Sequence, residues 1–173
     1  MKTHDIAGAR AEVELSLDVP VERLWSLITD VSRIGEWSPE ATYGEWLDDE
    51  GPAEGARFDA RNEFPNGLRT QVRCVVVESQ EPHVFAYEVY ADAGSETPLA
   101  TWRYELRPCG PDGSGTEVRQ SFVHEEGESG VSRAMRDDPD NADKHLAARL
   151  EQLREHMTTT LHAMARSESG MDD

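Results

Sequence analysis

VELSLDVPVERLWSLITDVSRIGEWSP, residues 13–39, changes its hydrophobic period from two to about 3.6 within a few residues. Apolar and polar residues alternate over 11–19, which is typical of a half-buried strand. Pro20 fits the first position of a helix, because its missing N–H is not needed there. Apolar residues then recur at helical spacing over 21–31, and a second short helix ends before Ser38-Pro39. The segment therefore predicts one strand followed by two short helices.

Two tryptophans lie around this helical region. We expect Trp25 to pack the first helix against a sheet. Trp37 lies close to the break at Ser38-Pro39, where a chain often opens a space. Two alternatives stay open for Trp37: it fills the core, or it borders the mouth of a cavity and contacts a ligand.

Downstream of this segment the hydrophobic period returns to two. The breaks between the alternating runs are rich in Gly, Pro, Asp and Ser, which favour turns. Short strands at this spacing are typical of a meander of antiparallel hairpins. We expect strands at 41–47, 55–64, 68–79, 83–91, 99–108 and 115–125.

The C-terminal part of the chain carries the pattern of one long helix. Its apolar residues step by three or four and form a single stripe: Leu146, Leu150, Leu153, Met157, Leu161 and Met164. Asp140 or Asn141 would cap a helix over about 140–166, and 167–173 would form a flexible tail. The fold class is then α+β, with a curved seven-stranded antiparallel sheet wrapped around this helix. We expect 1–173 to form one domain with its core at about 10–166.

Composition limits the partners and the location. With 17 Lys and Arg against 35 Asp and Glu, the formal net charge is −18, which repels nucleic-acid phosphates and anionic membranes. No apolar run approaches the ~20 residues of a membrane span, and the N-terminus lacks the apolar stretch of a signal peptide. We therefore expect a cytoplasmic protein, monomeric or homodimeric. Two cysteines and six scattered histidines suggest no metal site and no cofactor.

Strand alternation also predicts which side chains face the space between sheet and helix. The expected inner face is mostly apolar and aromatic, with a few polar groups, as in small-molecule sites. The alternative is that each polar side chain is a core residue with a partner of its own. With Met157 from the helix, the candidate ligand-binding residues are Phe58, Asn62, Val72, Cys74, Phe85, Tyr87, Trp102, Tyr104, Gln120 and Phe122.

Three of the inward residues are candidates for catalysis. His124 titrates near neutral pH and could transfer a proton. Tyr87 and Tyr104 could donate hydrogen bonds to an enolate oxygen. His124 lies near a strand end, however, and the more usual expectation there is a solvated histidine with a structural role.

Several segments resemble the START / birch-pollen-allergen superfamily (SRPBCC), the helix-grip fold, in its polyketide cyclase/dehydrase-like branch. They are the opening stretch, "VVVESQEPHVFAYEV" (75–89), "TWRYELRP" (101–108) with "GTEVRQSF" (115–122), and "RLEQLREHMTTTLHAM" (149–164). The resemblance covers about 10–165. It implies binding of a hydrophobic small molecule, lipid or polyketide-like, in an internal cavity. The alternative is a polyketide aromatase/cyclase or dehydratase that uses the same cavity.

In similar cyclases, the resemblance implies, an arginine inside the cavity acts with nearby hydroxyls. Here Arg69 and Arg73 fall on the outward alternation of their strand, which argues against cyclisation. A slip of one residue in the strand register would turn Arg73 inward.

Overall fold

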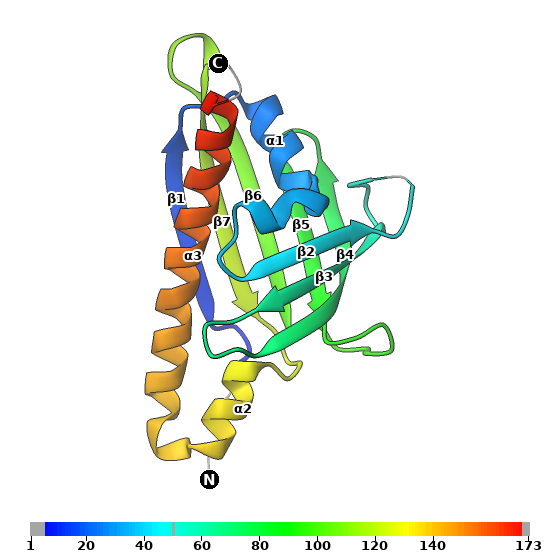
Figure 1. Ribbon diagram of the computed structural model, residues 1–173, viewed down its shortest axis with the longest axis vertical. Helices are drawn as coiled ribbons and strands as arrows, with labels where there is room; N and C mark the ends of the chain where they lie inside the picture. Colours follow the sequence, from blue (N-terminus) through cyan, green and yellow to red (C-terminus); the bar gives the residue numbers. More distant parts are fainter. Residues whose placement is uncertain (1–5, 50, 171–173) are drawn as a thin grey trace.

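The computed structural model describes residues 6–49 and 51–170, with the backbone alone at 168–170. It has the α+β architecture expected, a seven-stranded antiparallel sheet with a long C-terminal helix (Figure 1). The strands are β1 (Arg10–Leu17), β2 (Ala41–Trp46), β3 (Arg57–Glu63), β4 (Arg69–Gln80), β5 (Val84–Tyr90), β6 (Ala100–Cys109) and β7 (Gly115–His124). The α-helices are α1 (Val21–Thr29), α2 (Gly130–Asp137) and α3 (Ala142–Gly170), and the 3-10 helices are η1 (Val31–Glu36), η2 (Pro111–Gly113) and η3 (Pro139–Asn141).

The sheet has the strand order β1-β7-β6-β5-β4-β3-β2. Strands β2 to β7 form the predicted meander, and β1 pairs with β7 at the far edge. In β4 the register shifts between Val76 and Glu78, which leaves Val77 exposed. Before this bulge, Val72 and Cys74 line the inner face and Val76 is buried, as the alternation predicted; beyond it the extra residue shifts the alternation by one.

Helix α3 lies along β1 and reaches α2 at its N-terminal end (Figure 1). The C-terminal two thirds of its predicted stripe is core: Leu153, Met157, Leu161 and Met164 are each at most 3% exposed. Leu150 is half-buried against the same core, and Leu146 packs in a smaller cluster with Met135. Packing of this apolar face against the sheet stabilises the helix.

The opening segment packs α1 and η1 onto the sheet. Trp25 from α1 contacts the ring of Phe85 edge-on, with ring centroids 5.9 Å apart, as expected for a residue that packs α1 on the sheet. Helix η1 then lies directly on β2. A Cβ atom at Gly44 would come within 2.3 Å of the Val31 carbonyl oxygen, so only glycine allows this close approach.

Two features differ from the sequence expectations. Helix α2 was not expected, because its eight residues hold only two large apolar side chains, Val131 and Met135. Its start is fixed instead by a capping box, in which Ser129 and Ser132 bond each other's backbone N–H. Helix α3 begins at Ala142 and continues to Gly170, so the expected tail at 167–173 is helical as far as Gly170. Residues 171–173 lie outside the described residues.

Candidate functional site

A cavity of about 830 Å³ lies between the inner face of the sheet, η1, α2 and α3. This volume falls within the range of small-molecule sites, roughly 300–1,000 Å³. The structure places twelve of the sequence candidates in its wall: Phe58, Asn62, Val72, Cys74, Phe85, Tyr87, Trp102, Tyr104, Gln120, Phe122, His124 and Met157.

Aromatic rings form most of the sheet side of this wall. The ring centroids of Phe58 and Tyr87 are 5.0 Å apart, and those of Phe85 and Tyr87 are 5.5 Å apart. Trp102 and Phe122 make a similar edge contact at 5.1 Å. Contacts of this kind fix ring positions, so the wall is a pre-formed apolar surface.

Trp37 is the one candidate that the structure does not place in the wall. It is 5% exposed within the main core, and the Arg33 guanidinium lies 4.8 Å from its ring centroid. Of the two alternatives left open for Trp37, the geometry matches a core residue.

Three polar side chains meet in the middle of the aromatic wall: Tyr87, Tyr104 and Gln120, here named the inner cluster. Gln120 Nε2 donates to Tyr104 Oη at 3.0 Å, and Tyr87 lines the same cavity. Burial raises the pKa of both tyrosines, so the inner cluster is neutral. Gln120 is 3% exposed, and its Oε1 atom has no hydrogen-bond partner among the described residues.

A second polar group, here named the outer cluster, comprises Glu40, Arg149, Gln152 and His156. Arg149 donates to the Glu40 carboxylate through Nη1 and Nη2, at 2.6 and 3.0 Å, and His156 Nδ1 contacts the same carboxylate. Arg149 Nη1 also donates to Gln152 Oε1 at 2.5 Å. Burial alone would raise the pKa of Glu40, but the hydrogen bonds and charges of Arg149 and His156 outweigh it and hold that pKa below its usual range.

Sequence reasoning missed the outer cluster. One signal was available: Arg149, Gln152 and His156 step by three and four, directly beside the apolar stripe of α3. Residues at this spacing share one helix face. Glu40 lies more than 100 residues earlier in the chain and carries no local mark of its pairing.

His124 is not solvated, contrary to the expectation for a residue near a strand end. It is 1% exposed, and its ring contacts Ser129, the N-cap residue of the unexpected helix α2. Its Nδ1 lies 2.6 Å from the Glu125 carbonyl oxygen, which can only accept, so Nδ1–H donates there. Its Nε2, 2.6 Å from Ser129 Oγ, is then free to accept the hydroxyl hydrogen. Burial lowers the pKa of His124, which favours this neutral form.

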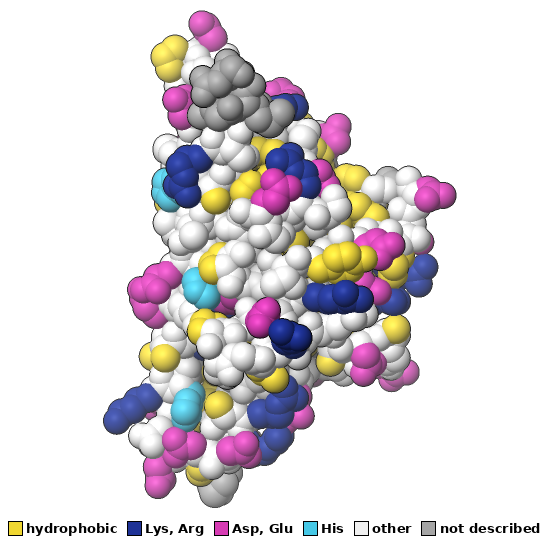
Figure 2. Space-filling view, viewed as in Figure 1, with side chains coloured by type: hydrophobic (Ala, Val, Ile, Leu, Met, Phe, Trp, Pro, Cys, Tyr) yellow, Lys and Arg dark blue, Asp and Glu magenta, His cyan; other side chains and the backbone are white. Residues whose placement is uncertain are grey.

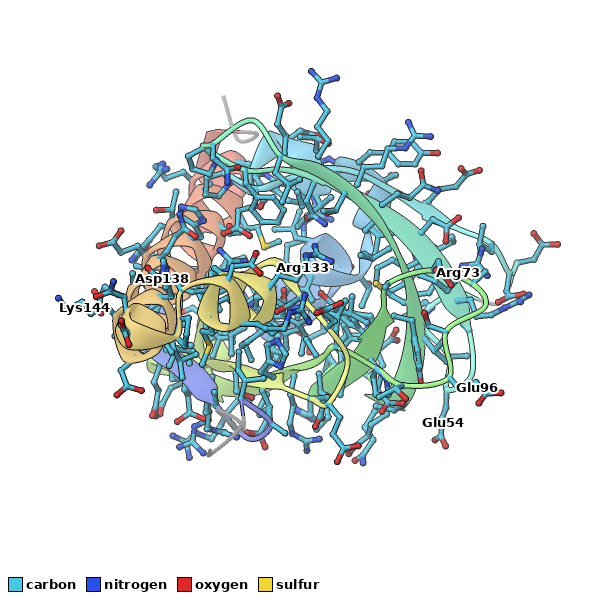
Figure 3. The ribbon with its side chains drawn as sticks, turned by 90° about the horizontal axis from the view of Figure 1, so that it is seen from below. Glu54, Arg73, Glu96, Arg133, Asp138 and Lys144 are labelled. Carbon is cyan, nitrogen blue, oxygen red and sulfur yellow. The ribbon has the colours of Figure 1, made fainter. Side chains whose placement is uncertain are left out.

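The cavity does contain arginines, although none comes from β4. Arg73 pairs with Asp59 at 2.5 Å on the outer side of the sheet, as the alternation predicted (Figure 3). Arg149 of α3 and Arg133 of α2 line the cavity instead. Figure 3 shows Arg133 over the opening between α2 and the sheet. Strand alternation gave no indication of these two arginines, because both lie on helices.

The surroundings of the site are mixed in charge. On the face shown in Figure 2, acidic and basic side chains are interspersed and hydrophobic side chains form small separate groups. Within 6–49 and 51–170, no three His, Cys, Asp or Glu side chains lie close enough together to hold a metal ion. In the same part of the chain, no helix is both long and apolar enough to cross a membrane.

Solved structures with the same fold come from several bacteria. A Polyketide_cyc-like protein from Corynebacterium glutamicum is 23% identical, covers 94% of this chain and 92% of its own, and has a TM-score of 0.64. A protein from Nitrosomonas europaea is 16% identical, with coverage of 95% and 96% and a TM-score of 0.66. A protein from Thermus thermophilus is 15% identical, with coverage of 95% and 99% and a TM-score of 0.65. At these identities the likeness shows the fold alone.

The sequence comparison extends the likeness beyond the fold. No curated protein matches the chain. The model of one family, described as polyketide cyclase / dehydrase and lipid transport, matches residues 8–158. These residues span β1 to α3 and include most of the cavity wall. The chain belongs to the polyketide cyclase / dehydrase and lipid transport family.

Proposed function

We propose that this protein binds a hydrophobic small molecule, lipid or polyketide-like, in the cavity between sheet and α3. The observation that carries the proposal is the 830 Å³ cavity with its aromatic wall. Withdrawing about 300 Å² of apolar ligand surface from water contributes at most ~7 kcal/mol at about 25 cal/mol per Å². Part of this gain offsets the loss of ligand freedom, so we expect a dissociation constant of roughly tens to hundreds of micromolar.

Charge supports the same class of ligand. The net charge of −18 disfavours nucleic acid and anionic membrane surfaces as partners. The inner part of the wall is neutral, so it suits an uncharged ligand body. A small apolar molecule meets both conditions.

The experiment is a titration with N-phenyl-1-naphthylamine, a neutral apolar dye that fluoresces when it leaves water. We expect a saturable rise at one dye molecule per chain, with a dissociation constant of roughly tens to hundreds of micromolar. Native mass spectrometry of the same samples should show one dye mass per chain. A linear, non-saturating signal with no retained mass would contradict the proposal.

The second candidate function is a polyketide aromatase/cyclase or dehydratase. It is favoured by Arg149 and His156, which line the cavity beside the Glu40 carboxylate. An arginine can stabilise an enolate oxygen, and a histidine held by a carboxylate can transfer a proton. Tyr87 and Tyr104 remain candidates for donors to an enolate oxygen, whereas both ring nitrogens of His124 are engaged by Glu125 and Ser129.

A kinetic test separates this activity from binding alone. A linear poly-β-ketone would be incubated with the wild type and with His156→Gln, and its conversion to a ring or a dehydrated product followed by mass spectrometry. For an enzyme, we expect His156→Gln to lower kcat about 10²-fold while KM changes little. No conversion by the wild type, with the poly-β-ketone displacing the dye, would leave binding as the function.

A further inference from the structure

The hydrogen-bonded pair of Tyr104 and Gln120 has one spare donor and one spare acceptor. The Tyr104 hydroxyl accepts from the Gln120 amide and so gives that residue no hydrogen. Within the described part of the chain, no acceptor takes the Tyr104 O–H hydrogen, and no donor reaches Gln120 Oε1.

Leaving these groups unpaired is unfavourable. Each buried polar group without a partner costs about 1–3 kcal/mol, and about 90% or more of such groups in native proteins are paired. Tyr104 is 6% and Gln120 3% exposed, and both line the cavity. A molecule inside the cavity, a water or a ligand that displaces it, can supply the missing partner.

The two spare groups define the chemistry of that partner. A hydroxyl can donate to Gln120 Oε1 and accept from the Tyr104 O–H at the same time. A carboxylate can only accept, and it would be a buried charge with no cation in the inner cluster. An ether or a ketone could use the spare donor but would leave Gln120 Oε1 unpaired.

We propose that the ligand carries an uncharged hydroxyl group, alcoholic, enolic or phenolic, which is bound by Gln120 and Tyr104. The apolar body of the ligand then lies against the aromatic wall and extends toward the outer cluster. This inference rests on the proposed binding function and adds the polar group that the ligand must have.

The opposite orientation of the Gln120 amide would predict a different ligand preference. If the amide were turned over, its oxygen would accept from Tyr104 and its N–H₂ would be the spare group. The cavity would then prefer a ligand that only accepts, such as an ether or a ketone. The two cases are distinguished by a pair of ligands that differ in the hydroxyl hydrogen.

The experiment measures displacement of N-phenyl-1-naphthylamine by 2-naphthol and by 2-methoxynaphthalene, which share one ring system. For the wild type we expect 2-naphthol to bind about tenfold tighter, since it forms two hydrogen bonds where the methyl ether forms one at most. Equal binding, or tighter binding of the ether, would overturn the proposal. Failure of the dye itself to bind would contradict the proposed function instead.

Two variants assign the preference to the inner cluster. Gln120→Met keeps the length of the side chain and removes the amide, so the preference for 2-naphthol should drop to about twofold or less. Arg119→Met is the matched control, because it changes the residue next to Gln120 on the outer side of β7 and leaves Tyr104 and Gln120 in place, and the preference should persist. If Gln120→Met fails to fold, Tyr104→Phe replaces it and should lower the preference likewise. An unchanged preference in a folded variant that still binds dye would overturn the proposal.

Discussion

The two polar clusters of the cavity differ in whether their buried polar atoms have hydrogen-bond partners. In the outer cluster, both carboxylate oxygens of Glu40 are bound by Arg149 and His156. In the inner cluster, Gln120 Oε1 has no partner among the described residues, and no group is charged. The Glu40 carboxylate of the outer cluster is bound by protein groups, whereas the proposed ligand would supply the missing partner of the inner cluster.

This difference suggests a division of roles along the cavity. The outer cluster joins the start of β2 to the middle of α3, so it closes the fold around the cavity. The inner cluster lies on β5, β6 and β7, at the centre of a sheet that other contacts already hold together. Changes in the outer cluster should therefore alter stability, and changes in the inner cluster should alter ligand preference.

The largest effect is expected in the apolar wall between the two clusters. Leu153 of α3 is 1% exposed, and Leu153→Ala should lower the free energy of unfolding by about 3–5 kcal/mol through lost burial and an enlarged cavity. Leu150→Ala, at a half-buried position on the same helix, should cost about 1–2 kcal/mol. Urea denaturation measures both. Equal losses in the two variants would show that the buried position of Leu153 is no better packed than the half-buried position of Leu150.

Removing the outer ion pair should have the next largest effect. Arg149→Met leaves the Glu40 carboxylate, 12% exposed at its side chain, without its main partner and should cost about 3 kcal/mol. The matched control is Arg154→Met, which breaks a more exposed pair with Glu151 one turn further along α3 and should cost about 0.5 kcal/mol or less. Similar small losses in both variants, again by urea denaturation, would mean that the outer cluster does not hold the fold together.

The two clusters should also lose stability at opposite ends of the pH range. The pKa of Glu40 is lowered in the folded protein, so its contribution is present above its unfolded pKa of 4.5 and is lost as pH falls below that value. The pKa of Tyr87 and of Tyr104 is raised, so the unfolded state ionises first above pH 10 and stability falls there.

Two variants test which residue causes the loss of stability at each end of the pH range. Glu40→Gln should flatten the loss of stability on the acid side and leave the alkaline side unchanged. Tyr104→Phe should flatten the alkaline side only. Thermal unfolding between pH 3 and pH 11 measures both, and a variant that changed the wrong limb would contradict the assignment.

The smallest effect is expected at His124. Both of its ring nitrogens are occupied, by the Glu125 carbonyl and by Ser129, so it has no hydrogen bond to offer a ligand. His124→Ala should therefore leave dye affinity within about tenfold of the wild type. A larger loss in a variant with unchanged circular dichroism would show that the ring contacts the ligand directly.

The sheet side of the cavity could be predicted from sequence because side-chain direction in a strand is local. Phe85 and Tyr87 on β5, and Trp102 and Tyr104 on β6, face the cavity as their alternation indicated. The bulge at Val77 lies in a run of three consecutive valines, 75–77, in which apolar and polar residues do not alternate.

The helical side could not be predicted in the same way, because its site residues depend on distant partners. The pairing of Glu40 with Arg149 spans 109 residues. His124 contacts Ser129, the N-cap residue of α2, whose eight residues have too few apolar side chains to indicate a helix. In both cases the local pattern describes one partner and contains no information on the other.

The central claim is that the cavity itself takes up the ligand, and filling it tests that claim most directly. Val72 lines the cavity from β4, whereas Val77 on the same strand is 39% exposed. Titration with N-phenyl-1-naphthylamine should show dye binding at least tenfold weaker for Val72→Trp, in which the new ring occupies the cavity. Val77→Trp should bind the dye as the wild type does. Undiminished binding by folded Val72→Trp would place the dye elsewhere and contradict the account.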